Sequence, residues 1–168
     1  MRFIKSGARR LLYKKTGIGV LSYMSKTTAE LENELQSINN SDDLEKWMNG
    51  NQAEKVRFCD AFVELCEKKG MKPANLVGKV AISKSYIYDM ANGKKNPSKE
   101  AVIKVALGLG ATVEETNLLL KSSGNKELYP KMEEDAVIEF GIRNHWNVYE
   151  IDEILKKRGL TMWLTDKE

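Results

Sequence analysis

One short stretch of this chain carries side chains with the chemistry to contact nucleic acid. Ser83 is a favourable N-cap for a helix in which Ile87 and Met90 face inward, so that lysine, serine, tyrosine and aspartate side chains point outward. Asn92-Gly93 is a typical helix stop, and two lysines follow it directly. Lysines suit phosphates, and short polar side chains suit the edges of bases.

The residues before this helix predict a second, shorter helix and a tight turn. Pro73 suits the first turn of a helix that has Leu76 and Val80 as its apolar positions. Ala81-Ile82-Ser83 then forms the turn, and the next helix is predicted to span Lys84–Asn92. Two short helices in this order suit the reading of double-stranded DNA.

The run from Ile82 to Ile87, continued by Met90 and by residues 92–98, resembles the recognition-helix signature of the Cro/phage-repressor (XRE-like) type of helix-turn-helix. The resemblance covers roughly residues 55–121. It implies a repressor-type five-helix domain whose second motif helix lies in the major groove of double-stranded DNA. The implied function is sequence-specific DNA binding, as a transcriptional regulator.

The resemblance also implies a role for each outward side chain. The base-facing residues are expected to be Lys84, Ser85 and Asp89. The residues near the DNA backbone are expected to be Tyr86, Tyr88, Asn92, Lys94 and Lys95. The carboxylate of Asp89 could accept a hydrogen bond from cytosine N4, or could simply repel phosphates.

Four positions depart from the pattern of that family. Pro73 stands where a glutamine is usual, which removes a common DNA contact, and Val77 stands where a small residue is usual. Ala81 replaces a usual glycine, and Asp89 takes a position that is often basic.

Positive charge is concentrated on the motif although the whole chain has a formal net charge of only +3. Residues 70–104 hold seven basic and two acidic side chains, whereas residues 24–69 and 105–168 each hold more acids than bases. Lysines that neutralise phosphates release counterions, so this distribution favours a nucleic acid partner.

The remaining sequence predicts consecutive helices, so the expected fold class is all-α. The expected parts are a basic leader over 1–24, a helical extension over 25–51, the helix-turn-helix domain over 52–124, and a helical hairpin with a tail over 125–168. The leader is expected to be disordered or weakly helical, and Met24 could equally be the true start. A basic arm on DNA phosphates and an amphipathic membrane contact are the alternatives for the leader.

Three further helix starts are predicted from capping residues. Thr27 with Glu30 fits a capping box, and Ser41 is the predicted N-cap of a second helix in the extension. Asn51 with Glu54 predicts the start of the first helix of the DNA-binding domain.

The C-terminal half repeats itself at a spacing of 35 residues. The matching segments are Ala101-Val102-Ile103 with Ala136-Val137-Ile138, Leu120-Lys121 with Leu155-Lys156, and Gly124 with Gly159. Matching capping boxes are predicted at Thr112 with Glu115 and at Asn147 with Glu150. Each unit is predicted to be a helical hairpin, unless the match reflects only shared helical periodicity.

The second hairpin is rich in aromatic residues, and a tail follows its last glycine. Most of these side chains are expected in the core, and Met162-Trp163-Leu164 is a candidate for an exposed patch. The hairpin is therefore expected to bind a second copy of the chain or a protein partner. The alternative function is an interaction adaptor, for example antitoxin-like, that keeps the helix-turn-helix fold and binds protein through Tyr86, Tyr88 and this hairpin.

No pattern favours catalysis, a bound metal or a cofactor. His145 has no matched nucleophile, and Gly108-Leu109-Gly110 precedes no P-loop lysine. On one helix, Cys59 and Cys66 would lie about 10 Å apart, too far for a disulfide, which fits core residues in a reducing compartment. No apolar run reaches the length of a membrane span. We therefore expect a cytoplasmic protein that has no cofactor and is not an enzyme.

Overall fold

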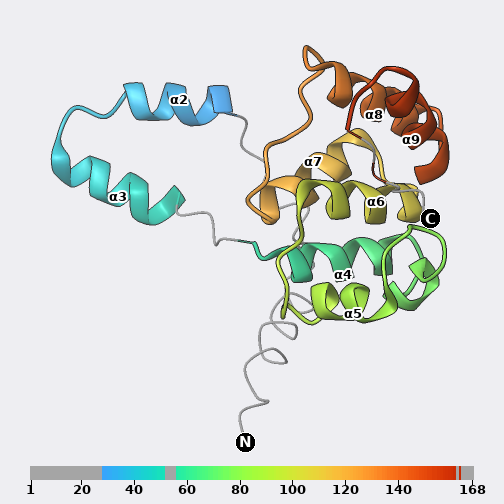
Figure 1. The fold of residues 1–168 in the computed structure, drawn as a ribbon. Helices are drawn as coiled ribbons and strands as arrows, with labels where there is room; N and C mark the ends of the chain where they lie inside the picture. The colour runs from blue at the N-terminus through green and yellow to red at the C-terminus, as the bar shows by residue number, and fades with distance from the viewer. Residues whose placement is uncertain (1–27, 52–55, 162, 164–168) are drawn as a thin grey trace, which may run out of the picture. The chain divides into compact units, whose positions relative to one another are not determined.

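The computed structural model describes residues 28–51, 56–161 and 163 (Figure 1). All regular elements in these ranges are helices, which confirms the all-α class. The chain divides into two compact units, with the boundary after Val56. The leader predicted over residues 1–24 lies outside the described ranges.

The first unit contains two short helices, α2 (Thr28–Gln36) and α3 (Ser41–Asn51). The predicted N-cap at Ser41 is wrong by one residue, because the side-chain oxygen of Asn40 accepts a hydrogen bond from Asp43 N at 2.8 Å. Asn40 also donates from its amide to the Asp43 carboxylate at 2.7 Å. The capping box predicted at Thr27 lies outside the described residues.

The apolar side chains of this unit stay largely open to solvent. Leu35 is 46% exposed and Met48 is 44% exposed. Trp47 is half-buried and donates its indole N–H to Glu34 at 3.0 Å, which links α3 to α2. Residues 29–49 include no buried side chain, so this hairpin has no core of its own within that range.

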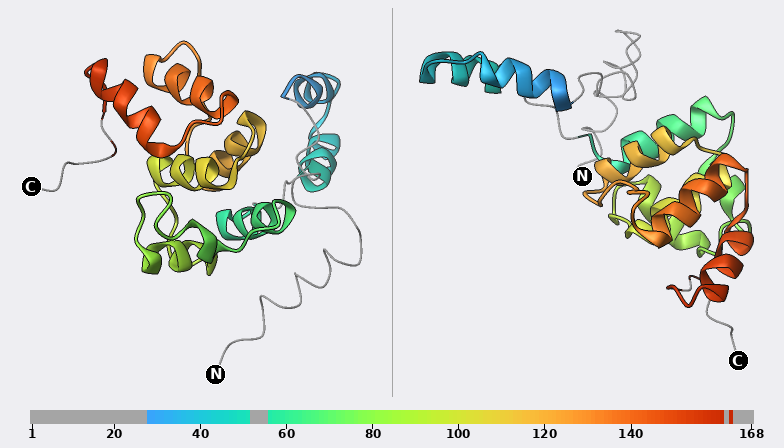
Figure 2. Two further views of the ribbon diagram at one scale, coloured as in Figure 1. Left: turned by 90° about the vertical axis from the view of Figure 1, so that its right-hand side faces the viewer. Right: turned by 90° about the horizontal axis from the view of Figure 1, so that it is seen from above.

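The second unit contains a bundle of short helices. Their bounds are α4 (Phe58–Lys68), the 3-10 helix η2 (Pro73–Leu76), α5 (Lys84–Ala91), α6 (Lys99–Leu109), α7 (Val113–Ser122), α8 (Glu133–Arg143) and α9 (Val148–Lys157). In Figures 1 and 2, α6 lies between the layer of α4 and α5 and the helices α8 and α9. Phe62 and Leu65 of α4 and Met90 of α5 are fully buried, as are Leu120 of α7 and Ile138 of α8.

The start predicted for α4 at Asn51 is wrong. Asn51 closes α3, and α4 begins at Phe58 after Arg57, whose backbone is extended. The Arg57 guanidinium pairs with Asp60 at 2.9 Å and so holds the first turn of α4 in place of a capping side chain. Phe58 and Phe62 stack within the helix, with ring centroids 5.4 Å apart.

The helix opened by Pro73 is shorter than predicted. It is a single 3-10 turn that ends at Leu76, so the predicted continuation to Val80 is wrong. Gly78 has φ +80, a left-handed conformation that ends a right-handed helix. Leu76 and Val80 are both fully buried all the same, so the two apolar positions keep the predicted role in the core.

The tail after α9 folds back onto the second unit, which contradicts the expected exposed patch at Trp163. Trp163 is only 7% exposed. Its backbone N–H donates to the buried Asp152 carboxylate at 2.5 Å, and its carbonyl accepts from the buried Lys104 ammonium at 3.0 Å. The neighbouring residues 162 and 164 lie outside the described residues.

The 35-residue repeat has a matching backbone in both of its copies. The predicted capping boxes at Thr112 with Glu115 and at Asn147 with Glu150 both form. The first helix of each hairpin has 11 residues and the second has 10. The turn between them contains Gly110 at φ +61 in the first hairpin and His145 at φ +57 in the second. The helix bounds leave three residues in the first turn and four in the second, but the hydrogen bond from Ala111 N to Ala106 O recurs 35 residues later from Trp146 N to Gly141 O. Both copies are therefore helical hairpins with the same hydrogen bond in the turn.

Candidate nucleic-acid interface

Helix α5 is held as a rigid element by its cap and by two buried side chains. Ser83 is the N-cap and accepts a hydrogen bond from Tyr86 N at 3.3 Å, as predicted. Ile87 and Met90 are fully buried, one helical turn apart. The helix ends at Ala91, one residue before the predicted end, and Gly93 follows at φ +71.

The predicted base-facing residues share the outer side of α5. Lys84 and Ser85 are exposed on the first turn, and Asp89 is half-buried one turn later. The Ser85 hydroxyl lies 3.3 Å from the Ser83 hydroxyl, so it can keep one hydrogen bond to the cap and direct another outward. Within the described residues, the Asp89 carboxylate forms no ion pair.

The predicted backbone-contacting residues lie along the flank and beyond the end of α5. Tyr86 is half-buried and Tyr88 is 39% exposed. The other three, Asn92, Lys94 and Lys95, are exposed in the loop after the helix. The carbonyl of Asp89 accepts hydrogen bonds from the N–H groups of Lys94 at 2.8 Å and Lys95 at 3.2 Å, which places this loop against the last turn of α5.

Two further exposed lysines lie in the segments that lead into α5, although sequence reasoning did not name them. Lys72 precedes η2 and Lys79 lies in the turn before α5. We call the full set the motif lysines: Lys72, Lys79, Lys84, Lys94 and Lys95. All five are exposed, and none forms an ion pair within the described ranges. The signal available in the sequence was the position of Lys72 and Lys79 on either side of η2.

Cations elsewhere in the described chain are mostly neutralised by neighbouring carboxylates. The paired ones are Lys46, Arg57, Lys68, Lys69, Lys99, Lys104, Lys121, Arg143, Lys157 and Arg158. The motif lysines therefore keep a charge that no ion pair neutralises within the described residues. An ammonium without a partner is free to neutralise a phosphate.

The turn before α5 has an unusual backbone conformation for its residue type. Ala81 has φ +50, in the left-handed region where glycine is preferred. This conformation is unfavourable for alanine, because the Cβ of Ala81 crowds its own backbone. Ile82 and Ser83 then lead directly into α5.

Gly108 holds the motif against α6, a role that the sequence did not reveal. A Cβ added to Gly108 would lie 2.3 Å from Val80 Cγ1 and 2.8 Å from Leu76 Cδ2. Real Cβ atoms do not approach other atoms so closely, so a larger residue at position 108 would force Val80 or Leu76 to shift. The segment rejected as a phosphate-binding loop thus contacts the core residues of the η2 turn.

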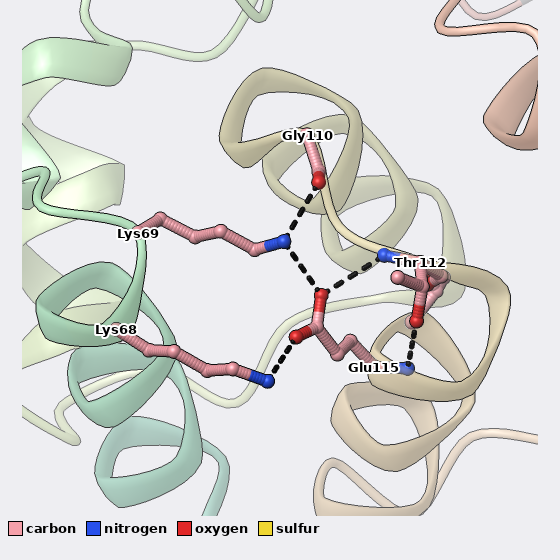
Figure 3. A network of polar contacts seen from close by, with 6 residues as sticks. Lys68, Lys69, Gly110, Thr112 and Glu115 are labelled. Atoms are coloured by element: carbon pink, nitrogen blue, oxygen red, sulfur yellow. Dashed lines mark hydrogen bonds and ion pairs between the residues drawn. The ribbon is translucent and has the colours of Figure 1, made fainter.

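A polar network joins α4 to the turn before α7 (Figure 3). The Glu115 carboxylate accepts hydrogen bonds from Lys68 at 2.6 Å, Lys69 at 2.9 Å and Thr112 N at 3.0 Å. Lys69 also donates to the carbonyl of Gly110 at 2.9 Å. Burial alone would raise the pKa of Glu115, but the hydrogen bonds from both lysines and Thr112 outweigh it and lower the pKa to about 2.

The two cysteines are free and buried, as expected. Burial raises the pKa of the Cys66 thiol to about 11, and it also raises the pKa of the Cys59 thiol. Both therefore stay protonated and unreactive near neutral pH. Among the described residues, no group of histidine, cysteine and acidic side chains is arranged to hold a metal ion.

No protein-family model, no curated protein and no solved structure matches this chain. In the described part of the chain, none of the helices is long and apolar enough to cross a membrane. The fold class and the site geometry therefore carry the functional argument by themselves.

Proposed function

We propose that this protein binds double-stranded DNA in a sequence-specific manner and acts as a transcriptional regulator in the cytoplasm. The observation that carries the proposal is the unpaired charge of the motif lysines around a capped and buried helix. Helix α5 has eight residues, so it is about 12 Å long, and the major groove is about 12 Å wide. Lysines before and after such a helix are spaced to reach phosphates on both sides of the groove.

In this proposal, the outer face of α5 reads bases. Lys84 donates to guanine O6 or N7, Ser85 contacts either base type, and Asp89 accepts from cytosine N4. Tyr86, Tyr88 and Asn92 lie near the sugar-phosphate backbone with Lys94 and Lys95, and these five fix the register of the helix.

The first experiment is a selection of bound fragments from random duplex DNA with the full chain, followed by a salt titration on the selected site. If the four motif lysines other than Lys84 each neutralise one phosphate, log affinity should fall with log salt at a slope of roughly −3 to −4. An affinity that does not change with salt would contradict the proposal.

Substitutions then separate base contacts from phosphate contacts. Lys84→Ala should cost about 1 to 3 kcal/mol on the selected site and relax the preference at one base pair. Lys94→Ala should weaken binding to all sequences alike and make the salt slope shallower by about 1. The matched control is Lys126→Ala, because Lys126 is also exposed and unpaired within the described residues but lies outside the motif.

A second candidate function is an adaptor that binds protein through the same surface. The observation that favours it is the exposure of the Tyr88 side chain, which is 39% exposed in the middle of α5. An adaptor would tolerate neutralisation of Lys84 and Lys94, whereas a DNA-binding protein would not. The same two substitutions therefore distinguish the two functions.

A further inference from the structure

The two helical hairpins of the second unit pack against each other through reciprocal contacts. Helix α6 contacts α9, and α7 contacts α8. Helices α6 and α8 are the first helices of their hairpins, and α7 and α9 are the second helices. In each contact, the first helix of one hairpin therefore packs on the second helix of the other. Each hairpin therefore turns one face toward its copy and the opposite face, here called the outer face, away from it.

The outer face of the first hairpin is covered by the elements that precede it. Helix α4 packs on α7 and supplies Lys68 and Lys69 to the Glu115 carboxylate. The turn after η2 packs on α6 at Gly108. As a result Val105 and Leu119 of this hairpin are fully buried.

The residues at equivalent positions of the second hairpin are less buried. Phe140, which is 35 residues after Val105, is 55% exposed. Ile154, which corresponds to Leu119, is half-buried, whereas Leu119 is fully buried. Glu150, which corresponds to Glu115, is exposed and forms no ion pair within the described residues. The second hairpin thus keeps the apolar positions and the carboxylate of a helix-binding face, but neither α4 nor η2 packs extensively on it.

We propose that the outer face of the α8–α9 hairpin binds an amphipathic helix of a partner protein that carries adjacent lysines or arginines near its C-terminal end. The intramolecular precedent is α4, whose apolar stripe and Lys68-Lys69 pair occupy the equivalent face. This inference does not depend on the DNA-binding proposal, because it uses none of the motif lysines.

The Glu150 carboxylate explains why the partner is basic. Glu150 is exposed and forms no ion pair within the described residues, whereas Glu139 and Glu153 are paired with Arg143 and Lys157 of the same hairpin. A second copy would bring a second Glu150 carboxylate to the contact, and like charges facing each other oppose association. A basic helix would instead pair with the Glu150 carboxylate, while its apolar stripe covers Phe140 and Ile154.

The test uses the full chain and a labelled peptide with the α4 sequence, residues 57–72, in which both cysteines are alanine. A second peptide carries Lys68→Glu and Lys69→Glu. Fluorescence anisotropy should show that the first peptide binds with a Kd below about 1 mM and that charge reversal weakens binding at least about tenfold. No saturable binding of the first peptide would overturn the proposal.

Variants of the full chain locate the bound peptide. Phe140→Ser and Glu150→Gln should each weaken binding about five- to tenfold. The matched control is Tyr129→Ser, because Tyr129 is 52% exposed but lies in the linker before α8. Binding that neither Phe140→Ser nor Glu150→Gln affects would mean that the peptide replaces the chain's own α4, and it would overturn the proposal.

Sedimentation velocity of the full chain tests whether a second copy of the chain occupies this face instead. The chain should sediment as a monomer without the peptide. A dimer that Phe140→Ser converts to a monomer would show that a second copy covers this face, which would overturn the proposal of a basic partner helix.

Discussion

Replacing Glu115 with glutamine removes the charge at the centre of the network that joins α4 to α7 (Figure 3). The carboxylate is bound by Lys68, Lys69 and Thr112 N at 2.6 to 3.0 Å, and its side chain is only 10% exposed. Glutamine keeps the size of the side chain and can still accept from Thr112 N. Glu115→Gln therefore tests the charge rather than the packing.

The pKa of Glu115 gives the expected decrease in the free energy of unfolding of Glu115→Gln. The pKa falls from 4.5 to about 2 in the folded protein, which corresponds to about 3 kcal/mol in favour of the charged form. Because the Lys68 side chain is 56% exposed, screening by water reduces the expected loss in the free energy of unfolding to about 2 kcal/mol. Since the folded pKa is the lower one, this contribution is fully present above about pH 4.5 and disappears as the pH falls toward 2.

Urea unfolding followed by circular dichroism at several pH values measures this difference. Wild type and Glu115→Gln should differ by about 2 kcal/mol at pH 7 and converge as the pH falls through the range from 4.5 to 2. The matched control is Glu150→Gln, because Glu150 forms the same capping box in the second hairpin without a lysine. An equal loss for both variants, or a difference that does not change with pH, would refute the reasoning.

Two further substitutions test the support of the motif. Ala81→Gly should raise the free energy of unfolding by about 1 kcal/mol, because glycine adopts φ +50 without crowding; thermal unfolding measures the gain, and a loss would contradict it. Gly108→Ala should lower the free energy of unfolding by about 1 to 3 kcal/mol, although alanine favours a helix, because the new Cβ meets Val80 Cγ1 at 2.3 Å. The control is Gly70→Ala, which adds a Cβ with nothing within 4 Å but places alanine at φ +65. The decrease in the free energy of unfolding should be larger for Gly108→Ala than for this control.

Several local features could be predicted because short-range chemistry controls them. The cap at Ser83, the stop at Gly93 and the capping box of Thr112 with Glu115 form as the residue types predict. Each depends on a hydrogen bond or a backbone conformation within a few residues, so neighbouring residue types are sufficient to specify it.

Local signals also failed where two of them competed. Asn40 and Ser41 are both good N-caps, and the structure uses Asn40. Pro73 opens a helix, but the left-handed Gly78 ends it after one turn. In both places the residue types allowed more than one local structure, and the sequence did not show which one would form.

By itself, the sequence determined the all-α class, the position of α5, the repeat of the helical hairpin and the excess of lysine on the motif. Only the tertiary structure decided which lysines form ion pairs and that Trp163 is buried. It also decided that a side chain at position 108 would meet Val80 and Leu76. These features join residues that are far apart along the chain, such as Lys104 and Trp163. Their energies depend on distances that exist only after the helices have packed, so composition and spacing cannot reveal them.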